Sequence, residues 1–383
     1  MPPTTSTARD IAQDDATYDS PFAIGWDHAR HRLTPPLERL CINPRLRDGF
    51  QAGRAAFGGR TLAASTAVRE WLALRLEALA AGCAFETVRL TPGYLARLAV
   101  PHCPITRQSL ADVVDGWRVA RVRRDAGYAA GNLSRLSARA DAAQARLGLA
   151  ESLDLLRAGR SDADACHAGL TLAQVRRLVV LRSFVRPLPH EAAALPLLVL
   201  PPPGLLLLNP LQALQCCLTR AFGEATPNRR LAALREALPD AASRDALDAF
   251  VAAYHPVVAA AVTAASTPAR RWALEDAWAD GRVLGRWKRF ARTLTAAQCE
   301  ALLPGLEPRL LLQRPDALAT EGWALASGGR AAPPRRLAPQ RATAAAAQRP
   351  AQRERSERAI APLPPAGARD ASLRQRHLFT RLD

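Results

Sequence analysis

Apolar residues recur every three or four positions through most of the chain, which is the spacing of a helix that buries one face. The clearest run covers residues 65–81 and stops at Gly82, a residue type that commonly ends helices. A shorter apolar helix is expected at residues 94–100, after the turn residues Pro92 and Gly93. The pattern therefore predicts a mainly α-helical fold.

Further along the chain, a hydroxyl residue is twice followed three positions later by glutamine, a pattern that predicts a helix start. Thr171 with Gln174 opens one helix, and Thr295 with Gln298 opens another that ends near Pro304. Further helices are expected at residues 211–222, 230–238, 242–254, 257–264 and 269–278.

The most apolar stretch, residues 192–208, contains four prolines. Proline interrupts a helix, so this stretch is not expected to span a membrane. Its leucines nevertheless require cover from water. Residues 195–210 are therefore predicted to form an extended, buried connector.

A different pattern begins at Cys103. Residues 117–122 alternate apolar and polar side chains, which predicts a short strand. Residues 127–132 read Gly-Tyr-Ala-Ala-Gly-Asn, which indicates a loop or hairpin. A helix is expected over residues 133–147. Together these signals predict a small ββα-like unit at residues 101–148.

The order of these motifs resembles the HNH family of nucleases, which have the ββα-metal fold. In one branch of that family a CPxT turn precedes a strand of SxDRxD type, a GYxxGN loop and a helix that starts near SxRAN. The matching segments here are Cys103–Thr106, Val119–Val122, Gly127–Asn132 and Ser137–Asp141. The resemblance covers about 45 of the 383 residues. It marks Gly127, Tyr128, Gly131 and Asn132 as the loop motif.

Several positions that the resemblance would assign to catalysis have changed. Ala120 stands where the strand carboxylate is expected, Asp141 replaces the helix asparagine, and Gln144 replaces a lysine. Only Asn132 is kept as a metal-ligand candidate, and its position after Gly131 favours a turn residue that caps the helix over a ligand. A hydrolytic metal site needs at least two or three donors. The resemblance therefore implies a degenerate module, with no catalytic residue, metal or other cofactor expected.

Charge changes this picture, because the formal net charge is +17. Residues 118–146 contain seven arginines and two aspartates, a balance of +5. Arginine can bind phosphate with two parallel hydrogen bonds. The candidate nucleic-acid contacts are Arg118, Arg121, Arg123, Arg124, Arg135 and Arg139. Residues 329–383 add twelve arginines and four acids, and such a basic tail raises non-specific affinity for nucleic acid.

Three functions follow. The first is a nucleic-acid-binding protein, with DNA favoured over RNA, that descends from an HNH nuclease and does not cleave. It predicts that the candidate arginines gather on one face. The second is a helical protein that binds another protein; it predicts arginines scattered or paired with carboxylates, and an exposed apolar patch elsewhere. The third is an active metal-dependent nuclease, which requires acidic or histidine side chains near Asn132.

The expected organisation is a disordered leader at 1–20, helical regions at 21–100 and 149–327 on either side of the ββα unit at 101–148, and a disordered basic tail at 328–383. Seven cysteines without regular spacing favour a reducing, cytoplasmic location. The acidic N-terminus does not resemble a signal peptide. Asp27, His28 and His31 form either a weak metal-site signal or a surface turn.

Overall fold

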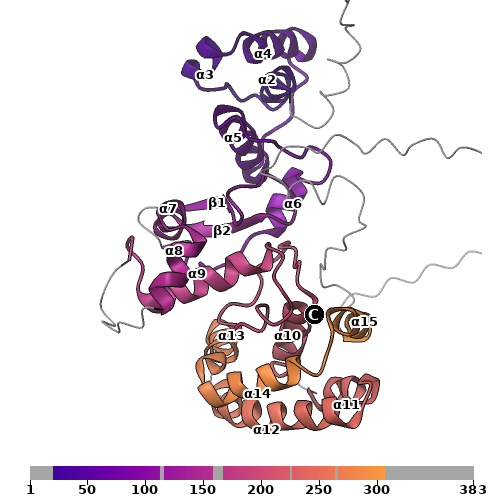
Figure 1. Ribbon diagram of the computed structural model, residues 1–383. Helices are drawn as coiled ribbons and strands as arrows, with labels where there is room; N and C mark the ends of the chain where they lie inside the picture. Colours follow the sequence, from indigo (N-terminus) through magenta and orange to yellow (C-terminus); the bar gives the residue numbers. More distant parts are fainter. Residues whose placement is uncertain (1–19, 113–115, 158–166, 225–226, 264–265, 307–383) are drawn as a thin grey trace, which may run out of the picture. The chain divides into compact units, whose positions relative to one another are not determined.

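The computed structural model describes residues 20–112, 116–157, 167–224, 227–263 and 266–306 (Figure 1). The predicted leader (apart from Ser20) and the predicted basic tail lie outside the described residues. The described chain is mainly helical, as the apolar spacing predicted. Its helices are α2 (Pro21–Arg30), α3 (Leu37–Ile42), α4 (Pro44–Phe57), α5 (Thr66–Ala80), α6 (Pro92–Arg97), α7 (Ala138–Arg146), α8 (Leu149–Arg157), α9 (Leu172–Phe184), α10 (Pro210–Ala221), α11 (Pro227–Ala237), α12 (Ala241–Thr263), α13 (Thr267–Asp276), the 3₁₀ turn η1 (Ala277–Ala279), α14 (Gly281–Ala291) and α15 (Ala296–Leu306).

A two-stranded antiparallel sheet, β1 (Trp117–Arg121) and β2 (Leu133–Ser137), stands out within this helical chain. Trp117 lies opposite Ser137, and the pairing runs on in register to Arg121 opposite Leu133. Successive side chains of a strand point to opposite faces. Val119 and Leu133 belong to one apolar cluster, with residues of α5 and α6. Ala120 and Leu136 belong to another, with residues of α7 and α9. Both faces of the sheet are therefore covered.

The larger cluster continues through the proline-rich connector into the C-terminal helices. At its centre, fully buried aromatic rings contact one another: Phe250 and Trp278 lie 5.3 Å apart between centroids, and Trp278 meets Trp287 edge-on at 5.4 Å. The leucines of the predicted connector, including Leu197 and Leu207, are buried in the same core. The expected burial of the connector is confirmed, but the segment is not extended throughout: the amide of Leu205 donates to the carbonyl oxygen of Pro202, which closes a turn.

Helices α2 and α4 pack unusually closely, and glycines permit the approach. A Cβ added at Gly49 would lie 2.0 Å from the carbonyl oxygen of Phe22. One added at Gly25 would lie 2.1 Å from the carbonyl oxygen of Leu46. Any side chain at either position would have to push the two backbones apart.

Many predicted helices are confirmed. The run at 65–81 forms α5, and both Thr-x-x-Gln patterns make reciprocal caps at the starts of α9 and α15. The helix expected from Leu133 is wrong in its first turn, because residues 133–137 form β2. Ser137 caps the helix instead: its hydroxyl accepts a hydrogen bond from the amide of Ala140.

The two helices expected at 242–254 and 257–264 form one helix, α12, with Pro256 inside it. Proline removes a single backbone hydrogen bond and kinks or breaks most helices. Here Tyr254 and Val258, on either side of Pro256, are both buried in the main core, and this packing holds the helix continuous.

Candidate nucleic-acid interface

The loop between β1 and β2 is held by the side chain of Asn132, which is completely buried. Its Oδ1 accepts a hydrogen bond from the amide of Arg123 at 2.9 Å. Its Nδ2 donates to the carbonyl oxygens of Arg123, at 3.0 Å, and Gly127, at 2.9 Å. The carboxamide therefore closes the loop from inside. It neither caps the following helix nor faces a space where a metal could bind.

The rest of the loop motif also faces inward. Gly131 has φ of +96°, and its amide donates to the hydroxyl of Tyr94 at 2.7 Å. An added Cβ at Gly131 would lie 2.2 Å from Leu206, so this position requires glycine. The backbone of Tyr128 pairs with that of residues 84–86, and its ring stacks on Phe85. Burial raises the pKa of the Tyr128 hydroxyl, which keeps it neutral.

Two of the six candidate arginines lie on the sheet face that α5 and α6 cover. Arg121 places its guanidinium 4.6 Å from the ring of Tyr128 and donates to the carbonyl oxygen of Ala126 at 2.8 Å. Arg135 pairs with Glu70 at 2.9 Å and lies 4.2 Å from the ring of Trp117. Both side chains are thus tied to neighbours within the fold.

Two more candidates are paired with carboxylates. Arg123 contacts Asp125 at 3.2 Å, and Arg124 contacts Asp141 at 3.0 Å. Asp125 also pairs with Arg186 at 2.7 Å. Burial by itself would raise the pKa of Asp125, but the charges of Arg186 and Arg123 outweigh it and the pKa is lowered. Asp125 therefore stays ionised and holds both guanidinium groups.

Arg118 and Arg139 are exposed. Arg118 donates to the carbonyl oxygen of its neighbour Trp117, and Arg139 lies on the surface of α7. The structure therefore does not gather the six arginines on one face. Four have partners in the chain: Arg121 and Arg135 on the covered side of the sheet, and Arg123 and Arg124 in ion pairs at the surface.

Unpaired cations are found instead on α14, which the sequence reasoning did not single out. Val283, Trp287 and Phe290 bury one side of this helix in the main core. The opposite side carries Arg282, Arg286, Lys288 and Arg289, and Arg292 follows at the C-terminal end. In the part of the chain that the structure describes, none of these five side chains forms an ion pair or a hydrogen bond.

We call the five cations the basic face of α14: Arg282, Arg286, Lys288, Arg289 and Arg292. Two acidic residues, Asp280 and Glu191, lie near it. Asp280 precedes the helix and caps it: its Oδ1 accepts hydrogen bonds from the amides of Arg282, at 2.7 Å, and Val283, at 3.0 Å. Glu191 lies beside a small hollow that it shares with Lys288 and Arg292. Added Cβ atoms at Gly281 and Gly285 would meet nothing within 4 Å, so the helix backbone is open on this side. Cations at 282, 286 and 289, with apolar residues at 283, 287 and 290, are the sequence signal that could have revealed the face.

Among the described residues, no group of three or more His, Cys, Asp or Glu side chains is placed to hold a metal ion. Asp27 is instead paired with Arg75 at 2.6 Å, and His28 is buried, with its Nδ1 2.8 Å from the carbonyl oxygen of Ile24. No helix in the described ranges is both long enough and apolar enough to cross a bilayer.

Comparisons with known proteins add no relatives. No family model matches the chain, no curated protein matches it, and no solved structure matches it.

Proposed function

We propose that this protein binds duplex DNA through the basic face of α14 and does not cleave it. The observation that carries the proposal is the contrast between two sets of cations. Of the six candidate arginines near the sheet, three are paired with carboxylates and Arg121 is held against the ring of Tyr128, whereas the five cations of the basic face of α14 have no ion pair or hydrogen bond among the described residues. Free cations can neutralise phosphates and release their counterions.

The geometry of α14 suits a polyanion. From Arg282 to Arg292 the helix rises about 15 Å, at 1.5 Å per residue. Trp287 and Phe290 fix its inner side in the core, so the outer side is presented by a rigid element. Gly281 and Gly285 leave room for a phosphate to approach the backbone. An α-helix fits the major groove of B-form DNA, whereas the A-form RNA groove is too narrow.

The resemblance to HNH nucleases enters this proposal as lineage. What supports this lineage is the chain order of β1, loop, β2 and α7. Its loop asparagine now supports the loop itself, as the hydrogen bonds of Asn132 show. We infer that such a unit serves as a scaffold between two apolar clusters, and that binding without cutting has passed to α14.

The test is binding of the full chain to a labelled duplex at two salt concentrations, with Mg²⁺ present. Replacing Arg282, Arg286 and Arg289 by Gln removes three charges from α14. If the variant neutralises three fewer phosphates, the slope of log affinity against log salt should become shallower by about 2.7. The matched control replaces Arg118, Arg124 and Arg139, three exposed arginines of the ββα-like unit, by Gln.

Four outcomes are distinguishable. A loss confined to the α14 variant supports the proposal. An equal loss in both variants means that net charge, not this face, determines binding. Unchanged binding in the α14 variant refutes the site. Shortened DNA would favour the metal-dependent nuclease.

A second candidate, binding of another protein, is favoured by α3. None of its six residues is buried, and Leu37 and Ile42 are 75% and 77% exposed. Exposed apolar residues of this size mark contact surfaces when they lie together. Changing both to Ser should abolish any self-association that sedimentation velocity detects in the unmodified chain, while leaving DNA affinity unchanged.

A further inference from the structure

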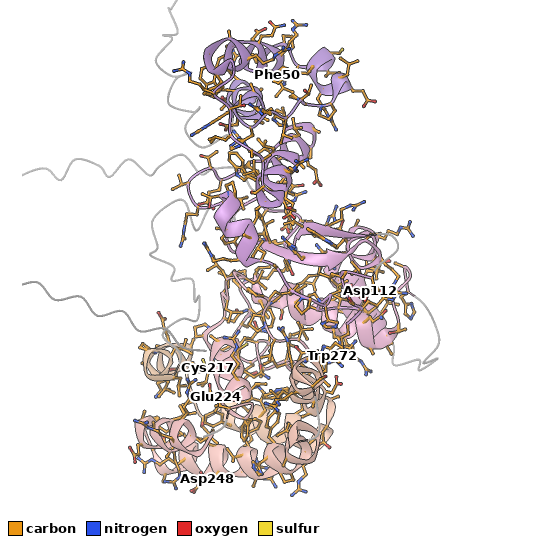
Figure 2. The ribbon with its side chains drawn as sticks, turned by 180° about the vertical axis from the view of Figure 1, so that it is seen from behind. Phe50, Asp112, Cys217, Glu224, Asp248 and Trp272 are labelled. Carbon is orange, nitrogen blue, oxygen red and sulfur yellow. The ribbon has the colours of Figure 1, made fainter. Side chains whose placement is uncertain are left out.

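A cavity of about 320 Å³ lies between three segments that are distant in sequence. They are the turn at 100–104, the connector around Pro202, and α13. Rigid apolar groups form most of its wall: Pro101, Pro104, Pro202, Pro268 and Trp272 (labelled in Figure 2). Sites for small ligands are typically apolar pockets of a few hundred Å³ or more with a small number of placed polar groups.

Two polar side chains at this cavity have capacity to spare. The ring of His102 meets Trp272 edge-on at 5.3 Å, and its nitrogens form no hydrogen bond with the described residues. Arg271 is 38% exposed; its Nε donates to Glu275 and its Nη2 donates to the carbonyl oxygen of Leu200. Its Nη1 has no hydrogen-bond partner among the described residues, so it is available to a ligand.

The acidic residue of the lining is already satisfied. Glu275 is buried, with one oxygen accepting from Arg271 and from the amide of Leu200, and the other accepting from Arg107 at 3.2 Å. Its charge is balanced, so it does not select for a cation. The groups that remain open are a guanidinium, an imidazole and an aromatic face.

We propose that this cavity binds a small aromatic acid, with the ring between Trp272 and the prolines and the carboxylate at Arg271 and His102. Aromatic rings gain from edge-on and offset contacts with tryptophan, and carboxylates bind arginine with charge-assisted hydrogen bonds. The volume accommodates one or two fused rings. The proposal is independent of α14 and of DNA binding.

The test uses ¹⁹F NMR of the full chain, whose seven tryptophans are labelled as 5-fluorotryptophan. Trp272→Phe assigns the reporting resonance. Indole-3-acetate is titrated against its uncharged analogue indole-3-acetamide. The Trp272 resonance should shift saturably with the acid, and the amide should bind about tenfold more weakly or worse, the cost of one charge-assisted hydrogen bond.

Val100→Phe adds a phenyl ring to the lining, narrows the cavity and should weaken or abolish the shift, whereas Val257→Phe, at a residue 41% exposed outside the cavity, should not. A shift that Val100→Phe leaves intact, equal affinity for acid and amide, or no Trp272 shift at 10 mM ligand would each overturn the proposal. The acid–amide comparison uses the unmodified chain, so it does not depend on whether Val100→Phe folds.

Discussion

Single side chains that look like candidates for chemistry are used here to hold backbone. Asn132 satisfies three backbone groups of one loop, and Gly131 lets that loop lie against Leu206. A buried amide with this many partners costs little to keep and much to remove, because its partners would be left without hydrogen bonds in a dry interior. His28 in α2 is likewise buried and bonded to the backbone, with its Nδ1 2.8 Å from the carbonyl oxygen of Ile24.

Replacing Asn132 by Ala should lower the free energy of unfolding by about 2–4 kcal/mol, since it leaves buried backbone groups unpaired. Chemical denaturation measures this. Asn43→Ala is the matched control: Asn43 caps α4 through one hydrogen bond to the amide of Leu46, so its loss should cost about 1 kcal/mol. Equal costs at the two sites would contradict the role assigned to Asn132.

A pH dependence follows from His28. Burial lowers its pKa from the ordinary 6.5, and the nearby charges of Arg75 and His31 also lower it. The hydrogen bond between its Nδ1 and the carbonyl oxygen of Ile24 and the charge of Asp27 raise the pKa but do not outweigh burial. The unfolded chain then binds more protons below that value, so stability falls as pH drops from 7 to 5. His28→Gln should reduce this loss in denaturation at both pH values. The exposed His255→Gln should not.

At the scale of elements, burial on one or both sides decides what a charged residue can do. Arg121 and Arg135 lie on a sheet face that α5 and α6 cover, so their guanidinium groups contact Tyr128 and Glu70 within the fold. The cations of α14 lie opposite a single buried face and remain open. The effect of a glycine also depends on its surroundings: Gly25 and Gly49, where α2 meets α4, leave no space for a side chain, whereas Gly285 in α14 does.

Gly49→Ala and Gly285→Ala make the same change inside a helix, with opposite expected effects. At Gly49 the new methyl group would collide with the backbone of Phe22 and destabilise the fold by about 2 kcal/mol or more. At Gly285 it meets nothing, and the better helix propensity of alanine should stabilise by about 0.5–1 kcal/mol. Thermal unfolding followed by circular dichroism compares the two; a shift in the same direction would refute this account.

At the scale of the molecule, the ββα-like unit and the C-terminal helices share one core and one ion-pair network. Arg107 follows the turn at 103–106 and reaches α13. It pairs with Asp276 at 2.7 Å and with Glu275, while Arg177 lies 3.8 Å from Asp276. The side chains of Arg107 and Glu275 are almost fully buried. The network therefore ties regions that the sequence separates by nearly 170 positions.

Removing Arg107 should cost about 3 kcal/mol, because Glu275 would keep its buried charge with one partner fewer. Arg235→Ala is the control, since its pair with Asp248 is half exposed at both side chains and should contribute under about 1 kcal/mol. Urea denaturation of both variants checks this. If Arg107→Ala were as mild as the control, the network would not hold the two regions together.

The sequence by itself determined the helical class, the capped starts of α9 and α15, and the buried connector, because helical spacing, capping and proline act within a few residues of one another. It also indicated a strand and a loop around Asn132. Tertiary structure decided that residues 133–137 pair with β1, that α12 continues past Pro256, and that α2 and α4 pack through glycines. It alone decided which cations stay free, because Glu70, Asp125 and Asp276 meet their arginines through contacts between distant parts of the chain.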